Sequence, residues 1–225
     1  MQYMIKTEGV KRCFRTSGGD FWALKGIDME APRAALTILK GRSGSGKTTL
    51  LNILGALDKP TEGRVLFEGM DITRMDEQRR TRLRRKQIGF VFQSVALIPM
   101  MNAFENVEYA LRLARYPGDR KERAMECLKL VGLTQRVNHL PQELSGGEQQ
   151  RVAIARAIAH KPRVIFADEP TGELDTNTGL QVVKIFKELT QAEGVSIIMT
   201  THDTGLMEIG DAVYELEDGE VVHGE

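Results

Sequence analysis

A glycine-rich loop between an apolar run and a helical pattern is the feature that most constrains the fold. The apolar run covers residues 34–39, and the loop reads Gly41-Arg42-Ser43-Gly44-Ser45-Gly46-Lys47-Thr48. It follows the P-loop pattern, which requires a strand before the loop and a helix after it. The pattern from Thr48 to Leu57 predicts that helix, so the sequence indicates an α/β chain that binds a nucleotide.

The loop offers donors to phosphate oxygens. Its glycines allow backbone N–H groups to turn inward, and the following helix directs its positive end at the same anions. We expect Lys47 to reach the β- and γ-phosphates and the Thr48 hydroxyl to ligate Mg²⁺. The positions expected to bind nucleotide here are Gly41, Ser43, Gly44, Ser45, Gly46, Lys47, Thr48 and Thr49.

Two adjacent carboxylates follow a second apolar run. Residues 164–167 are apolar, and Asp168-Glu169 comes directly after them. Burying such a pair is costly unless it has a partner or a task. With a P-loop present, we expect Asp168 to face Mg²⁺ and Glu169 to activate the attacking water, which is worth about 10²–10⁴ in rate. An acidic pair with no chemistry is the alternative.

A second predicted helix N-terminus could also bind an anion. Ser145-Gly146-Gly147 opens a helical pattern, and the first N–H groups of a helix have no partner within it. One nucleotide does not need two such ends on one chain. A plain capping role for the serine is the alternative.

The octapeptide Leu144-Ser145-Gly146-Gly147-Glu148-Gln149-Gln150-Arg151 resembles the signature motif of the ATP-binding-cassette (ABC) ATPases. In that family two cassettes pair head to tail, and each signature covers the ATP on the other P-loop. The resemblance therefore implies ATP and Mg²⁺ as cofactors and a second copy of the chain as partner. It also implies that Ser145 and Gly147 contact that copy's ATP.

Other motifs match the family in the expected order. Gln93 resembles the glutamine that contacts Mg²⁺ or the attacking water, and His202 resembles the histidine that contacts the γ-phosphate. Asp175 resembles the aspartate of the loop that crosses the dimer interface. Phe14 resembles the aromatic residue that stacks on adenine, with a core role as the alternative. The catalytic residues implied are Lys47, Gln93, Glu169 and His202, and the metal ligands implied are Thr48, Gln93 and Asp168.

The remaining patterns indicate an α/β P-loop core with a mostly parallel sheet. Alternating residues 3–14 and an apolar return over 22–29 predict an N-terminal antiparallel β subdomain. A helix-rich stretch over approximately 94–160 reads as a helical subdomain inserted in the RecA-like core. We expect one ABC ATPase domain over residues 1–225.

Composition bears on the partners and on the cellular location of the chain. The 31 basic and 31 acidic residues balance, and the two cysteines, Cys13 and Cys127, do not have the spacing of a metal site. The basic run over 79–86 is interpreted as a surface helix with solvated charges, so no nucleic acid is expected. Neither a bilayer-spanning run nor a signal peptide is evident. We expect a chain at the cytoplasmic face of the membrane, held there by an integral membrane permease.

Finer motifs resemble the MacB/LolD-like group, which serves macrolide, lipoprotein and antimicrobial-peptide exporters. The segments 54–63, 90–93, 105–108 and 167–172 carry this likeness. Glu173 and the tail segment 210–212 depart from it without removing a catalytic group. The expected function is ATP hydrolysis that drives a MacB/FtsX-type permease. An ATP-gated regulator of a membrane protein without transport is the alternative. We further expect residues 94–108 to line the groove that receives the permease.

Overall fold

The computed structural model describes residues 3–224 and contains two sheets. Four strands form an antiparallel sheet in the order β2-β1-β4-β5, and six form a second sheet in the order β10-β9-β3-β8-β7-β6. In the second sheet every pair is parallel except β9 and β10. The strands are β1 (Tyr3–Thr16), β2 (Gly19–Pro32), β3 (Leu36–Lys40), β4 (Glu62–Phe67), β5 (Met70–Asp71), β6 (Ile88–Val91), β7 (Val164–Ala167), β8 (Ser196–Thr201), β9 (Ala212–Glu217) and β10 (Glu220–Gly224).

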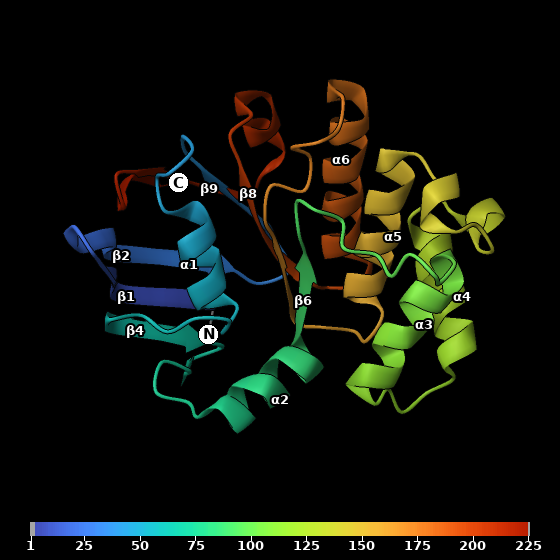
Figure 1. Ribbon diagram of the computed structural model, residues 1–225, viewed down its shortest axis with the longest axis horizontal. Coiled ribbons are helices and arrows are strands. Elements are labelled where there is room, and N and C mark those ends of the chain that lie inside the picture. The colour runs from blue at the N-terminus through green and yellow to red at the C-terminus, as the bar shows by residue number, and fades with distance from the viewer. Residues whose placement is uncertain (1–2, 225) are drawn as a thin grey trace.

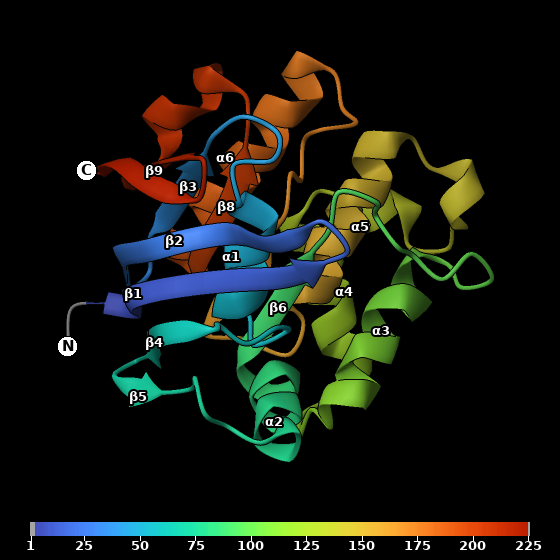
Figure 2. The same cartoon turned by 60° about the vertical axis from the view of Figure 1, so that its left-hand side comes forward.

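Helices cover both faces of the parallel sheet. The antiparallel sheet and α1 lie on one side, while α5 and α6 lie on the other (Figure 1). Figure 2 shows β1, β2 and β4 in front of α1. The helices are α1 (Lys47–Leu54), α2 (Glu77–Gln87), α3 (Ala103–Ala114), α4 (Arg120–Leu130), α5 (Gly146–Ile158) and α6 (Thr176–Ala192), with 3₁₀ turns η1 (Thr134–Arg136), η2 (Pro141–Glu143) and η3 (Thr204–Ile209).

This layering explains why the parallel strands are almost entirely apolar. Alternate residues of one strand belong to different hydrophobic clusters: Ile165 packs with α3–α6, whereas Phe166 packs with the antiparallel sheet and α1. Ile197 and Ile198 of β8 divide in the same way. A strand buried on both faces has no wet side and therefore reads as a continuous apolar run. The predicted α/β P-loop fold with its N-terminal antiparallel part is confirmed.

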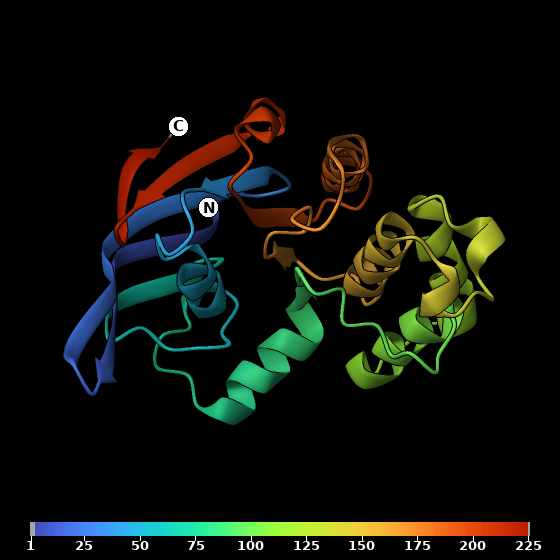
Figure 3. The same ribbon diagram turned by 45° about the horizontal axis from the view of Figure 1, so that its top comes forward.

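The chain between β6 and β7 is helical. It contains α3, α4 and α5, which lie on the opposite side of β6 from α1 in both Figure 1 and Figure 3. Arg123 of α4, which is 2% exposed, anchors this region to the core. It donates to the carbonyl oxygens of Ile158 and Ala159 and lies 2.9 Å from the carboxylate of Glu193, which follows α6. Buried donors and acceptors are thereby paired, as burial requires.

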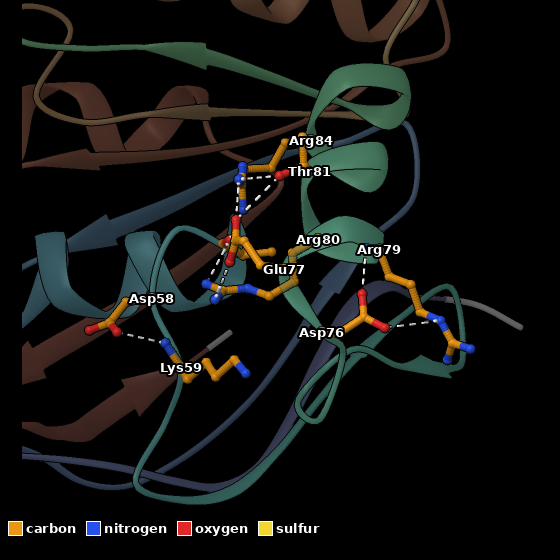
Figure 4. Close-up of polar contacts among 9 residues, drawn as sticks. Asp58, Lys59, Asp76, Glu77, Arg79, Arg80, Thr81 and Arg84 are labelled. Carbon is orange, nitrogen blue, oxygen red and sulfur yellow. Dashed lines mark hydrogen bonds and ion pairs between the residues drawn. The ribbon is translucent and has the colours of Figure 1, made fainter.

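Two details of the prediction are wrong. Helix α1 ends at Leu54 rather than Leu57, because Ala56 adopts a left-handed φ of 56° that closes the last turn. The charges of the basic run are not all solvated: Arg80 is only 7% exposed. Arg80 and Arg84 both donate to the carbonyl oxygen of Ala56, and both also contact Glu77 (Figure 4).

Candidate functional site

Helix α1 begins without a capping side chain. Its N-cap is Gly46, with φ 104°, and no side chain accepts from its first turn. Each other α-helix described in residues 3–224 starts with a side chain that does so: Asp76, Asn102, Asp119, Ser145 and Asp175. The free N–H groups and the positive end of α1 are therefore left for an anion.

The loop before α1 requires glycine at two positions. A Cβ on Gly41 would lie 2.4 Å from the carbonyl oxygen of Leu216, and one on Gly46 would lie 2.7 Å from that of Ala23. Both residues also have positive φ. The loop therefore packs directly on neighbouring backbone, where any side chain at these two positions would clash. The hydroxyl of Ser45 is buried and has no partner among the described residues, but neither Ser45 nor Gly41 lines the nucleotide cleft in this structure.

Lys47 lies folded over the loop. Its Nζ donates to the carbonyl oxygens of Gly41, at 2.7 Å, and Arg42, at 3.1 Å. The same Nζ is 3.6 Å from Oε1 of Glu169, and the side chain is only 4% exposed. A buried ammonium group with a single carboxylate near it is well placed to accept more negative charge, which the phosphates of a nucleotide carry.

Asp168 is brought beside Thr48. The Thr48 hydroxyl donates to Oδ1 of Asp168 at 3.1 Å, and the hydroxyl of Thr200 donates to the same oxygen at 2.7 Å. Hydroxyl and carboxylate oxygens at one point are the ligands that Mg²⁺ prefers, so this pair fits the ion. Thr200 was not predicted as a site residue, although its polar side chain directly after the apolar 197–199 run was a signal.

Glu169 is aimed by its backbone. It has a left-handed φ of 43°, and its N–H donates to the Thr200 hydroxyl at 2.8 Å. This turn places the carboxylate between Lys47, at 3.6 Å, and Nδ1 of His202, at 3.5 Å. Non-glycine residues in this conformation are strained, and such strain is concentrated at functional sites. The structure thus brings together Lys47, Thr48, Asp168, Glu169 and His202.

A cleft of about 280 Å³ extends from these residues to the β1–β2 hairpin. Phe14, which is 37% exposed, lines its outer part, as the adenine assignment requires. Phe21, on the facing strand, also lines the cleft and was not assigned from sequence. The other lining residues are Ala23, Ser43, Gly44, Gly46, Lys47, Thr48, Thr49 and Glu169.

Gln93 and Asp175 lie at the edge of this group. Nε2 of Gln93 is 3.2 Å from the place that a Cβ on Gly172 would occupy, three residues beyond Glu169. Asp175 and His202 line a smaller cleft of about 130 Å³ together with Gly172. The Asp175 carboxylate caps α6, and its hydrogen bonds, first from the Thr178 side chain, lower its pKa.

Ser145 and Gly147 do not line the nucleotide cleft. They lie at the start of α5, across β6 from α1 (Figures 1 and 3). Ser145 forms a reciprocal cap with Glu148, whose pKa is lowered to about 2 by hydrogen bonds from Arg136 and from the backbone N–H of Ser145. A Cβ on Gly147 would lie 2.4 Å from Cγ2 of Thr178 of α6, so close packing requires glycine there. The start of α5, which is capped by Ser145 and Glu148, is therefore separate from the uncapped start of α1.

Comparison with known proteins places this geometry in a family. Residues 24–172 match the ABC transporter family. The chain is 44% identical over 219 residues to the lipoprotein-releasing system ATP-binding protein LolD of Bacteroides thetaiotaomicron, covering 97% of this chain and 99% of that protein. It is 43% identical over 224 residues to the macrolide export ATP-binding/permease protein MacB of Wolinella succinogenes, covering 98% of this chain but 34% of that protein.

A solved structure shares the fold over the whole chain. The ATP-binding cassette MJ0796 of Methanocaldococcus jannaschii, in a dimeric post-hydrolysis state bound to ADP and Pi, superposes with a TM-score of 0.89 at 41% identity. The match covers 99% of this chain and 98% of that one. This chain belongs to the ABC transporter family and is one of its ATPase cassettes.

Proposed function

We propose that two copies of this chain pair head to tail around two MgATP and that the cycle of closing and reopening drives a membrane permease. The observation that carries this is the separation of the P-loop from the signature segment: α1 borders the nucleotide cleft, and Ser145 does not. A second copy would bring its own Ser145 to this cleft. The dimeric form of MJ0796 supports the arrangement.

Within one chain, the P-loop N–H groups and Lys47 hold the triphosphate. Thr48 and Asp168 would hold Mg²⁺ together with Gln93, and the bound ion would supply positive charge beside the phosphates. Glu169 accepts a proton from the attacking water, and Lys47, 3.6 Å away, orients its carboxylate. His202, which is 61% exposed, contacts the γ-phosphate from the far side of Glu169.

Across the interface, Ser145 and Gly147 contact the γ-phosphate of the other copy, and Asp175 lies beside its P-loop. In the single chain the hydroxyl of Ser145 donates to the carboxylate of Glu148 at 3.0 Å. When the dimer closes, this hydroxyl would donate to the γ-phosphate in place of Glu148. Donors from both chains then meet one phosphate, which makes ATP the link between the copies. In this proposal residues 1–225 form one domain, and 94–160 form a helical subdomain that carries the signature segment.

The permease is proposed to bind a cleft of about 390 Å³ on the helical side. Its lining is mainly apolar and comes from β6, α3 and α5, with Phe92 and Leu113 exposed. The expectation that 94–108 lines the permease groove stays a prediction; of that segment, Ala96 lines this cleft and Leu97 packs on the core. Arg84, Arg85 and Arg156 also line it, so we expect an apolar helix with acidic residues as the occupant.

In residues 3–224 no helix is long and apolar enough to cross a bilayer. Membrane attachment is therefore proposed to come from the permease, at the cytoplasmic face. The names of the LolD and MacB relatives support the release of a lipoprotein or the export of a macrolide drug as the work done; export of a peptide is proposed from the motifs of the sequence alone.

Glu169→Gln tests the chemistry. The amide keeps the shape but cannot accept a proton, so we expect retained ATP binding, a closed dimer in gel filtration with MgATP, and turnover lower by about 10²–10⁴. Glu173→Gln is the matched control, since Glu173 is exposed and lines neither cleft. Near-normal hydrolysis by Glu169→Gln would exclude Glu169 as the base.

Mixed dimers test the composite site. Lys47→Ala and Ser145→Arg should each abolish hydrolysis alone. When the two variants are mixed, about half of the dimers are hybrids in which one site combines both defects and the other is intact, so about a quarter of wild-type activity returns. If no activity returns while the hybrids form, each copy uses its own Ser145 and the head-to-tail pairing is wrong.

Leu113→Glu tests the permease cleft. Leu113 is 58% exposed, so a charge there should spare folding and release the permease in co-purification from detergent. Met125→Glu is the control, because Met125 is 40% exposed on α4 and does not line the cleft. Unchanged co-purification of Leu113→Glu would place the permease elsewhere.

A further inference from the structure

The side chain of Arg12 lies over the ring of Phe14. The guanidinium carbon is 4.6 Å from the ring centroid. The two residues are two positions apart on β1 and so project from the same face of the strand. A cation in this position is attracted by the electron-rich face of the ring. One face of Phe14 is thus covered by a residue of the chain itself.

An ion pair connects Arg12 to the end of the P-loop helix α1. Its Nη2 lies 2.8 Å from Oδ2 of Asp58, and the Asp58 N–H donates to the carbonyl oxygen of Asn52 in α1 at 3.1 Å. The other carboxylate oxygen of Asp58 accepts the N–H of Lys59, as Figure 4 shows. Nε of Arg12 is buried and makes no hydrogen bond within residues 3–224, so the ion pair and the ring define its position.

Phe14 lines the nucleotide cleft and Arg12 does not, which leaves part of the ring open to that cleft. We infer that Arg12 is a positioning residue for nucleotide binding: it holds the Phe14 ring in the orientation that stacks on the adenine base. Through Asp58, the ring is kept at a set distance from the helix that binds the phosphates. This inference rests on the proposed role of Phe14 in base binding.

The physical gain is preorganisation. A phenylalanine that is 37% exposed and unsupported would lose side-chain freedom when a base stacks on it, and that loss weakens binding. Arg12 restricts the ring before the nucleotide arrives. The competing account is that the charge of Arg12 simply attracts the phosphates. The two accounts differ in whether the effect of Arg12 requires Phe14.

The test is a double-variant cycle on the full chain, with binding of MgADP measured by calorimetry. Phe14→Ala should weaken binding by about 5- to 150-fold, the range for loss of one stacking contact. Arg12→Ala should weaken it by about three- to tenfold, and the double variant should bind as Phe14→Ala does. Magnesium pyrophosphate has no base, so its own affinity, measured by competition with MgADP, should be the same for all three variants. Lys11→Ala, which removes a neighbouring cation paired with Glu62, should leave MgADP binding unchanged.

Specific results would overturn the inference. A loss of pyrophosphate binding in Arg12→Ala, or fold-losses that multiply in the double variant, would assign the effect to charge. If Phe14→Ala weakens MgADP binding and Arg12→Ala does not, the base site stands and the role of Arg12 is wrong. If Phe14→Ala has no effect, the base site is wrong and the inference fails with it, while hydrolysis is judged separately through Glu169→Gln. Should Arg12→Ala unfold, Arg12→Gln keeps the stem without the charge and replaces it in the cycle.

Discussion

The carbonyl oxygen of Ala56 offers a quantitative test of how α1 is held. It follows the carboxyl end of α1, where a cation is favoured, and it accepts from Arg80 at 2.8 Å and from Arg84 at 2.7 Å (Figure 4). Ala56 is 3% exposed, so water cannot readily replace a lost donor. The two arginines therefore satisfy one buried acceptor twice.

Arg80→Ala removes the charged hydrogen bond to Ala56 and a second one to the exposed Glu77, and we expect the buried bond to account for most of a loss of about 1.5–3 kcal/mol in the free energy of unfolding. Arg84→Ala should cost less, because Arg84 is 22% exposed. In each single variant the other arginine still satisfies Ala56. Only the double variant leaves the buried carbonyl unpaired, which adds about 1–3 kcal/mol beyond the sum of the single effects.

The assay is urea unfolding followed by circular dichroism, with all variants at one temperature and pH. Arg79→Ala is the control: Arg79 is 74% exposed and lies 3.6 Å from Asp76, so its loss should change stability by less than about 0.5 kcal/mol. If the two single effects simply add, within about 0.5 kcal/mol, the arginines do not share a buried acceptor and the reasoning is refuted.

Three further predictions concern other parts of the chain. Arg123→Met should cost about 3–5 kcal/mol in urea unfolding, because it removes a buried guanidinium that pairs with the partly buried carboxylate of Glu193 and with two carbonyl oxygens. Hydrogen bonds from Arg136 and a backbone N–H lower the pKa of Glu148 from an ordinary 4.5 to about 2. The contribution of ionised Glu148 to the stability of the fold should therefore be complete above about pH 4.5 and lost as the pH falls toward 2. Glu148→Gln should remove this part of the pH dependence of acid unfolding. Burial raises the pKa of Cys127 to about 12, so a disulfide reagent should label Cys13 first and Cys127 only after unfolding.

Local patterns were sufficient for the phosphate loop and for most strands. The P-loop glycines and Lys47 are consecutive in the chain, and a helix must follow them. The apolar runs before Asp168 and His202 correctly predicted buried strands, because burial on both faces leaves no polar positions in between. Fold class and membership in the ABC family could therefore be predicted from the sequence.

Features that depend on distant neighbours could not be predicted. The burial of Arg80 requires the carbonyl of Ala56, 24 residues away, and the role of Thr200 requires Asp168, 32 residues away. The apolar cleft combines β6, α3 and α5, which are separated in the chain, so no single segment predicts it. Each of these is a contact between elements whose order in space differs from their order in the chain.

The sequence by itself determined that this chain has a P-loop, a carboxylate pair and a signature segment, because each is set by adjacent residues. Only the tertiary structure decided how they are placed. The sheet order puts β8 between β3 and β7, so Thr48, Asp168 and His202 converge at one edge while Ser145 lies across β6. Parallel strands present their carboxyl ends at the same edge, and this gathers residues that are far apart in the chain into one site.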